Sequence, residues 1–129
     1  MSSSSLRTPL ARVRGHGSAK SGTGHFIAQR VSAIALAFLA PYLLISGAIY
    51  LGPGFDAARY WIALPWVAAP LALFVLAACY HMQIGMQVII EDYIEKHLTR
   101  AALGILNVFV AAAVAIVALF AILKIFLGA

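Results

Sequence analysis

Charged residues are scarce in this chain. Asp, Glu, Lys and Arg together make up 10% of its 129 residues, whereas 64% are hydrophobic. Soluble domains usually carry about 25% charged residues, and a small domain in water needs polar surface to cover its core. The composition therefore excludes an ordinary water-soluble globule, and the hydrophobic side chains must face lipid or another protein.

Cysteine is almost absent as well. A single residue, Cys79, excludes an internal disulfide and the thiolate cluster that an iron–sulfur centre requires. Its position in an apolar stretch is typical of an inert packing thiol. The chain also lacks the glycine-rich fingerprint of dinucleotide-binding proteins, so it cannot carry out redox chemistry alone.

Long hydrophobic runs are what the sequence has in abundance. Residues 31–51, 62–90 and 101–126 each meet the length of about 20 apolar residues that a spanning helix needs. Gly52-Pro53-Gly54 predicts a tight turn after the first span, and Tyr60, Trp61 and Trp66 predict an aromatic belt beside it. Residues 91–100 form a polar connection that is compatible with an extension of the second helix. We therefore expect an all-α membrane protein, with three transmembrane helices in an up-down-up bundle over residues 25–129.

Basic residues predict the orientation of this bundle. The positive-inside rule places the N-terminus and the second connection in the cytoplasm and the C-terminus on the opposite side. The net charge of +5 thus reports topology and contact with anionic membrane lipids, and not nucleic-acid binding. The basic residues on the cytoplasmic side are Arg7, Arg12, Arg14, Lys20, Arg30, Lys96 and Arg100.

Residues 1–24 are rich in Ser, Gly and basic side chains and contain no long apolar run. We interpret this segment as a flexible, retained tail, because the apolar run after it has full spanning length and shows no small-residue cleavage site. A transit peptide is the alternative, since the segment is basic and free of acidic residues.

His81 is the most informative residue. It is the one imidazole inside a predicted span, and ionisable groups at membrane depth are costly enough to indicate function. Gly85 follows one turn later and leaves room for a planar group or a close helix. Asp92 lies eleven residues after His81, about 20° off the same helix face and about 16 Å along the axis. The spacing suits a cofactor held within the membrane below a polar site at its cytoplasmic surface.

Three interpretations of His81 remain open from the residues alone: a hydrogen bond to another helix, a proton relay, or a haem or metal ligand. Gln83 and Gln87 are compatible with polar contacts between helices, as is Asn107. Asp92 and Tyr93 could be ordinary interfacial residues. If haem is bound by two imidazoles, the second must come from another polypeptide, because His16, His25 and His97 lie outside the predicted spans.

Two motifs resemble a known family. These are Gly24-His25-Phe26-Ile27-Ala28-Gln29-Arg30-Val31-Ser32-Ala33 and His81-x-x-x-Gly85-x-Gln87-x-x-x-x-Asp92-Tyr93. Together with three spans, they are similar to the small hydrophobic D-type anchor subunit of succinate dehydrogenase, complex II. The resemblance covers about residues 24 to 126, and the spacing from His81 to Asp92-Tyr93 is its most specific part.

The resemblance implies a haem b site and a ubiquinone site. His81 would be one axial ligand of the haem iron, with Gly85 packed beside the ring and the other ligand supplied by the C-type anchor subunit. Arg30 and His25 would lie on the side of the haem propionates.

Tyr93, with Asp92 beside it, would border a ubiquinone site near the iron–sulfur subunit, which takes electrons from the flavoprotein subunit that oxidises succinate. We expect the inner membrane of a bacterium, with the mitochondrial inner membrane as the alternative. Alternatives are a quinone-independent cytochrome subunit, an anchor of a quinol:fumarate reductase, or a small transporter or channel subunit with a proton path through His81 and Asp92.

Overall fold

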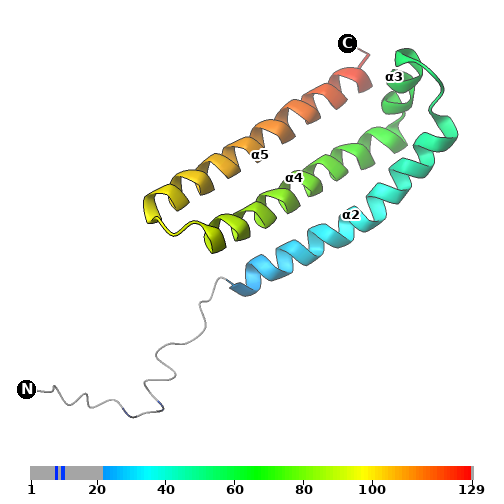
Figure 1. The fold of residues 1–129 in the computed structure, drawn as a ribbon. Coiled ribbons are helices and arrows are strands. Elements are labelled where there is room, and N and C mark those ends of the chain that lie inside the picture. The colour runs from blue at the N-terminus through cyan, green and yellow to red at the C-terminus, as the bar shows by residue number, and fades with distance from the viewer. Residues whose placement is uncertain (1–7, 9, 11–21, 129) are drawn as a thin grey trace, which may run out of the picture.

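A computed structural model describes residues 8, 10 and 22–128 of the chain. Over that part the fold is all-helical, with α2 (Gly22–Tyr50), α3 (Phe55–Ala63), α4 (Pro65–Tyr93) and α5 (His97–Phe126) (Figure 1). Three of these helices are long and apolar enough to cross a membrane, over Thr23–Tyr50, Pro65–Tyr93 and His97–Phe126. The prediction of an all-α protein with three spanning helices is confirmed.

The three long helices lie side by side in one layer, with α4 between α2 and α5 (Figure 1). Helix α4 packs against both neighbours, whereas α2 and α5, as described, make no extensive contact with each other. The start of α2 and the turn between α4 and α5 lie at one end of the layer, and α3 and the end of α5 lie at the other. This is the predicted up-down-up arrangement.

Helix α3 is a correction to the prediction, which began the second span at Ile62. Ile62 and Ala63 belong to α3, and α4 begins at Pro65. The break falls at Leu64, which is extended at φ −69° and ψ 128°. A residue before proline avoids the helical region because the proline ring clashes with it, and proline itself suits the first position of a helix. The expected turn at Gly52-Pro53-Gly54 is present, and Gly54 has a positive φ of 100°.

Trp61 packs α3 against α2 and is not a simple member of the predicted aromatic belt. Its ring is half-buried, and a Cβ added to Gly47 would lie 3.6 Å from it. Tyr60 and Trp66 are exposed, as expected for the belt. The Tyr42 hydroxyl donates a 2.6 Å hydrogen bond to the carbonyl oxygen of Trp66, which ties α2 to the first turn of α4.

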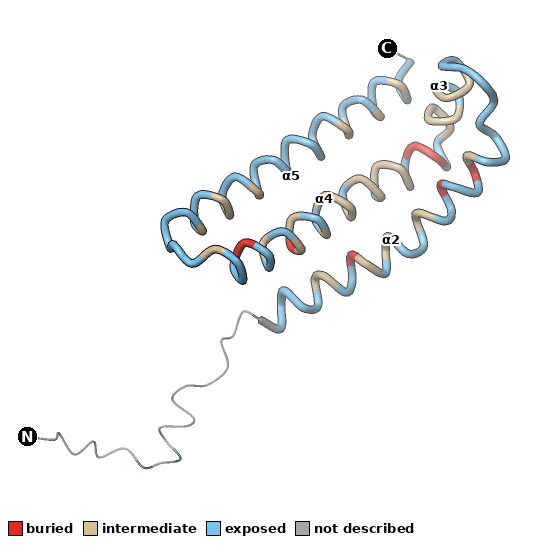
Figure 2. Tube along the Cα trace, viewed as in Figure 1, coloured by how far each residue is buried: buried red, intermediate tan, exposed pale blue. Residues whose placement is uncertain are grey.

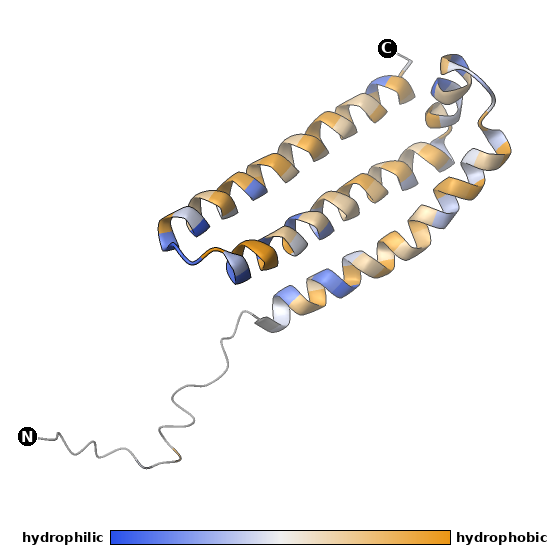
Figure 3. Cartoon of the chain, viewed as in Figure 1, coloured by the Kyte–Doolittle hydropathy of each residue, from blue (hydrophilic) through white to orange (hydrophobic). Residues whose placement is uncertain are grey.

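Few side chains are buried within the described chain (Figure 2). The surfaces of the three long helices are instead largely hydrophobic (Figure 3). Such a surface is stable only against lipid or another protein. The buried residues are Ser32, Leu43, Ser46, Val67, Ala68, Ile84, Ile90 and Ala111.

Both ends of the second connection differ from the predicted span limits. Helix α4 extends to Tyr93, three residues past the predicted 90, and α5 begins at His97, before the predicted 101. Only residues 94–96 separate the two helices. Most of the predicted flexible tail, residues 1–24, lies outside the described residues, and α2 begins at Gly22.

Candidate functional site

His81 lies where α4 packs against α2. Its Nδ1 atom is 3.0 Å from the hydroxyl oxygen of Ser32 on α2. Ser32 is only 6% exposed, so the contact is shielded from outside by the two helices. The intramembrane histidine is therefore held by a specific polar partner, as expected for an ionisable residue at this depth.

The hydrogen bonds of Ser32 favour one tautomer of His81. The Ser32 hydroxyl donates its only hydrogen to the carbonyl oxygen of Gln29, at 3.0 Å. The oxygen of Ser32 can then accept, so Nδ1 of His81 carries the proton. The other ring nitrogen, Nε2, keeps its lone pair and has no hydrogen-bond partner within residues 22–128. Metal-binding histidines are commonly oriented in this way, with one nitrogen donating and the other free to ligate.

Gly85 provides open space one turn from His81. A Cβ built on Gly85 would meet no atom within 4 Å outside its own helix. The chain therefore does not need a glycine here for its own packing, whereas a flat group or another helix approaching α4 would benefit from one. Half-buried His81 and Gly85 thus fit the requirement for a ring ligated by Nε2.

Asp92 and Tyr93 lie in the last turn of the same unbroken helix as His81. Both are exposed, Tyr93 by 80%. Neither side chain has a hydrogen-bond partner in the described part of the chain. Their hydroxyl and carboxylate groups are free to contact a ligand or another subunit at the end of the bundle.

His25 and Arg30 lie on different faces of α2. His25 precedes Ser32 by seven residues, about 20° from it around α2, and lines a small cavity of about 250 Å³ with Tyr80 and Gln83. Arg30 precedes Ser32 by two residues, about 200° away. Its guanidinium stacks on Phe26, 5.0 Å from the ring centroid. His25 is thus on the side of α2 that meets α4, and Arg30 is not brought toward His81.

The polar residues of α4 and α5 partly differ from expectation. Gln83 donates to Gln87 at 3.2 Å, and Gln87 donates to Glu91 at 2.8 Å, so the two glutamines form a ladder along α4 and not a link between helices. Asn107 of α5 does form the predicted interhelical bond, donating to the carbonyl oxygen of Gln83 at 2.8 Å. This bond fixes α5 against α4 two residues from His81.

Ser32 is the residue whose role the sequence did not reveal. It stands within the first motif, but nothing in the order of residues shows that it faces His81, 49 positions away. The usable signal was a serine hydroxyl in an apolar span, since such a group needs a partner. In the described chain no three His, Cys, Asp or Glu side chains gather as a metal site.

Comparison with known proteins agrees with this architecture. Residues 4–121 match the family described as the succinate dehydrogenase/fumarate reductase transmembrane subunit. The chain is 34% identical over 122 residues to the succinate dehydrogenase hydrophobic membrane anchor subunit of Paracoccus denitrificans, covering 95% of this chain and 94% of the relative.

Two other relatives are similar over most of their length. The corresponding subunit of Rickettsia bellii is 33% identical over 98 residues, which are 76% of this chain and 78% of the relative. The succinate dehydrogenase membrane anchor subunit of Reclinomonas americana is 34% identical over 100 residues, 75% of this chain and 80% of the relative. No solved structure gives a significant match.

Proposed function

Since the chain belongs to the succinate dehydrogenase/fumarate reductase transmembrane subunit family, we propose that it anchors a succinate:ubiquinone oxidoreductase in the membrane and contributes to its haem b and ubiquinone sites. Three apolar helices and relatives named as membrane anchors make it a multi-pass membrane protein. Its partners are the other subunits of complex II: a C-type anchor, an iron–sulfur subunit and a flavoprotein subunit.

The observation that carries the haem proposal is the 3.0 Å contact between Ser32 and His81 Nδ1. It leaves Nε2 of a neutral imidazole available as an axial ligand. A haem held there stores and releases single electrons within the membrane. This chain would ligate one side of the iron and leave space for the ring at Gly85, while the C-type anchor supplies the second histidine.

Residues near the start of α2 would hold the propionates of the haem. His25 is favoured by its position near Ser32 on the same face of α2 and by the adjacent cavity. Arg30 carries the permanent charge that suits a carboxylate. Because Arg30 lies on the opposite face of α2, its side chain would have to pass around the helix to reach the propionates. We therefore assign it the more peripheral contact.

Tyr93 and Asp92 contribute to the ubiquinone site. The exposed phenol of Tyr93 can donate a hydrogen bond to a quinone carbonyl, and such a bond strengthens as negative charge develops on that oxygen. Asp92 accepts hydrogen bonds and can orient a neighbouring donor or hold a proton near the quinone. Both lie on the same end of the layer as the start of α2, which we place in the cytoplasm of a bacterium, at its inner membrane.

The test is a reduced-minus-oxidised spectrum of the chain purified with its partner subunits. The substitution His81→Ala should abolish the b-type signal. The control His97→Ala should retain it, because His97 lies at the start of α5, outside the proposed haem site. An unchanged haem spectrum in His81→Ala would refute the ligand assignment and leave His81 a packing role.

A further inference from the structure

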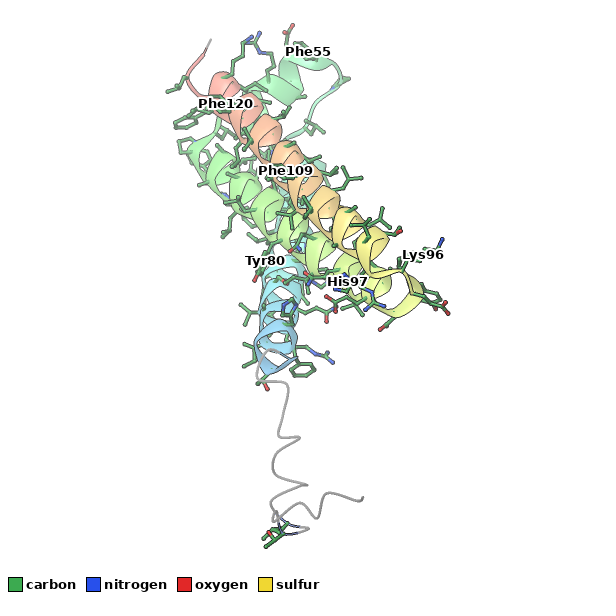
Figure 4. The ribbon with its side chains drawn as sticks, turned by 90° about the vertical axis from the view of Figure 1, so that its left-hand side faces the viewer. Phe55, Tyr80, Lys96, His97, Phe109 and Phe120 are labelled. Carbon is green, nitrogen blue, oxygen red and sulfur yellow. The ribbon has the colours of Figure 1, made fainter. Side chains whose placement is uncertain are left out.

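A cleft between α4 and α5 is lined by none of the proposed haem and quinone residues, although Glu91 in its lining directly precedes Asp92. It has a volume of about 450 Å³ and opens at the end of the bundle where α4 turns into α5. Figure 4 places Lys96 and His97 at this turn. The cleft is lined by Gln87, Ile90, Glu91, His97, Arg100, Ala101, Gly104, Ile105 and Val108.

The polar and apolar parts of the cleft are separated along the helix axis. Glu91 and Arg100 lie within the last turn of α4 and the first turn of α5. Val108, at the other end of the cleft, is eight residues beyond Arg100, about 12 Å deeper along a helix. That depth reaches well into a hydrocarbon core whose half-thickness is about 15 Å. The cleft therefore has the polarity profile of an amphiphile that stands upright in the membrane.

The charged groups at the mouth of the cleft are of both signs. The Glu91 carboxylate accepts one hydrogen bond, from Gln87, and its second oxygen is without a partner in the described chain. Half-buried Arg100 uses its Nε–H for the carbonyl oxygen of Ile94, at 2.8 Å. Its remaining four N–H groups make no bond or ion pair with described residues. The site thus offers both a free acceptor with negative charge and a free donor with positive charge.

We propose that this cleft binds one molecule of a zwitterionic phospholipid with a primary ammonium, that is, a phosphatidylethanolamine. The phosphate would accept hydrogen bonds from Arg100, the ammonium would donate to Glu91, and an acyl chain would lie against Gly104 and Ile105. The proposal depends only on the chain spanning a membrane and not on the haem assignment.

Other amphiphiles match these groups less well. Ubiquinone offers only hydrogen-bond acceptors, which would leave the Glu91 carboxylate facing another acceptor. The glycerol hydroxyls of phosphatidylglycerol can donate to Glu91, but this lipid has a net negative charge and no cation to balance the carboxylate. The quaternary ammonium of phosphatidylcholine has no N–H to donate. Of these lipids, only phosphatidylethanolamine offers Glu91 both an N–H donor and a positive charge while its phosphate accepts from Arg100.

Gly104 allows the acyl-chain part of the site to be blocked cleanly. Gly104 lines the cleft, and a Cβ built on it would meet no atom within 4 Å outside its own helix. The substitution Gly104→Leu therefore places a side chain in the open space of the cleft. Glu91→Gln keeps an acceptor for Gln87 and removes the charge. Glu95→Gln is the matched control, since Glu95 is an exposed carboxylate four residues later, in the connection between α4 and α5, and does not line the cleft.

The experiment is lipid analysis by mass spectrometry of the complex containing this chain, purified through delipidating detergent and then offered each phospholipid separately. The wild type and Glu95→Gln should retain and rebind one additional phosphatidylethanolamine relative to Gly104→Leu. Glu91→Gln should bind it about tenfold more weakly, the effect of one charge-assisted hydrogen bond. The haem spectrum should be the same in all four proteins.

Three results would overturn the proposal. The first is equal phosphatidylethanolamine content in the wild type, Glu91→Gln and Gly104→Leu. The second is equal rebinding of phosphatidylglycerol or phosphatidylcholine. The third is recovery of quinone, or of no lipid, from the wild-type cleft, which would show that another molecule or a partner subunit fills it.

Discussion

Replacing Ser32→Ala removes the one described hydrogen-bond partner of His81. The substitution deletes the acceptor 3.0 Å from Nδ1 at a position that is 6% exposed, so water does not readily replace it. A buried donor left without a partner costs about 1 to 3 kcal/mol. Loss of such a contact behind a metal-binding histidine typically lowers metal affinity by about 10- to 100-fold. We therefore expect Ser32→Ala to lower the affinity of the site for haem by about 10- to 100-fold.

The haem that remains in Ser32→Ala should also have a higher midpoint potential. A hydrogen bond from Nδ1–H makes the imidazole a stronger electron donor to iron, which favours the oxidised form. For a one-electron couple, about 1.4 kcal/mol corresponds to about 59 mV, so losing part of one hydrogen bond should raise the potential by roughly 20 to 60 mV. A role of Ser32 in helix packing alone would not change this quantity.

Optical redox titration of the purified complex measures both effects. Ser46→Ala is the matched control, because Ser46 is a buried serine of the same helix. Its hydroxyl also donates to the carbonyl oxygen three residues earlier, that of Leu43, at 3.1 Å. Ser32→Thr retains the hydroxyl and should restore the potential. Equal haem content and potential in Ser32→Ala and Ser46→Ala would refute the argument that Ser32 orients His81.

Three further predictions concern other parts of the chain. Tyr93→Phe should slow ubiquinone reduction by about tenfold or more and spare succinate oxidation by artificial acceptors; unchanged quinone kinetics would remove Tyr93 from the site. Gly85→Leu should leave membrane insertion intact, since its Cβ is unobstructed, but lower the ratio of haem to protein, whereas Gly104→Leu should not; equal ratios would count against a ring beside Gly85. Asn107→Ala removes the 2.8 Å bond to Gln83 and should lower the unfolding free energy in mixed micelles by only about 0.6 kcal/mol; a loss above about 3 kcal/mol would show that the bond does more than link two helices.

The sequence predicted the three spanning helices because an uninterrupted apolar run of this length has few other stable arrangements. It did not predict α3. Residues 62 and 63 are apolar and adjoin the second span, so hydrophobicity alone assigned them to it. The local signal that separates the two helices is Leu64-Pro65, where the proline restricts the residue before it to extended backbone.

The candidate site was predictable only in part. His81 stood out because an imidazole in an apolar span is rare, and its spacing to Asp92 follows from a continuous helix, which α4 is. Helical periodicity does not determine contacts between helices, so Ser32 could not be paired with His81. The ladder from Gln83 through Gln87 to Glu91 lies within one helix at a spacing of four residues, so that spacing could have predicted it. Asn107 was predictable as a donor between helices, but its acceptor on α4 was not.

Because the three long helices form a layer one helix thick, both faces of the layer are open. Newly synthesised and alone in the bilayer, the chain would expose to lipid the two faces of α4 that α2 and α5 do not cover. The imidazole of His81 is only half-buried, and polar groups facing hydrocarbon are costly. We expect membrane quality-control proteases to degrade the chain while it is unassembled, and not once partner subunits cover those two faces. Degradation of the surplus would then match the amount of this chain to that of its neighbours without any regulation of its synthesis.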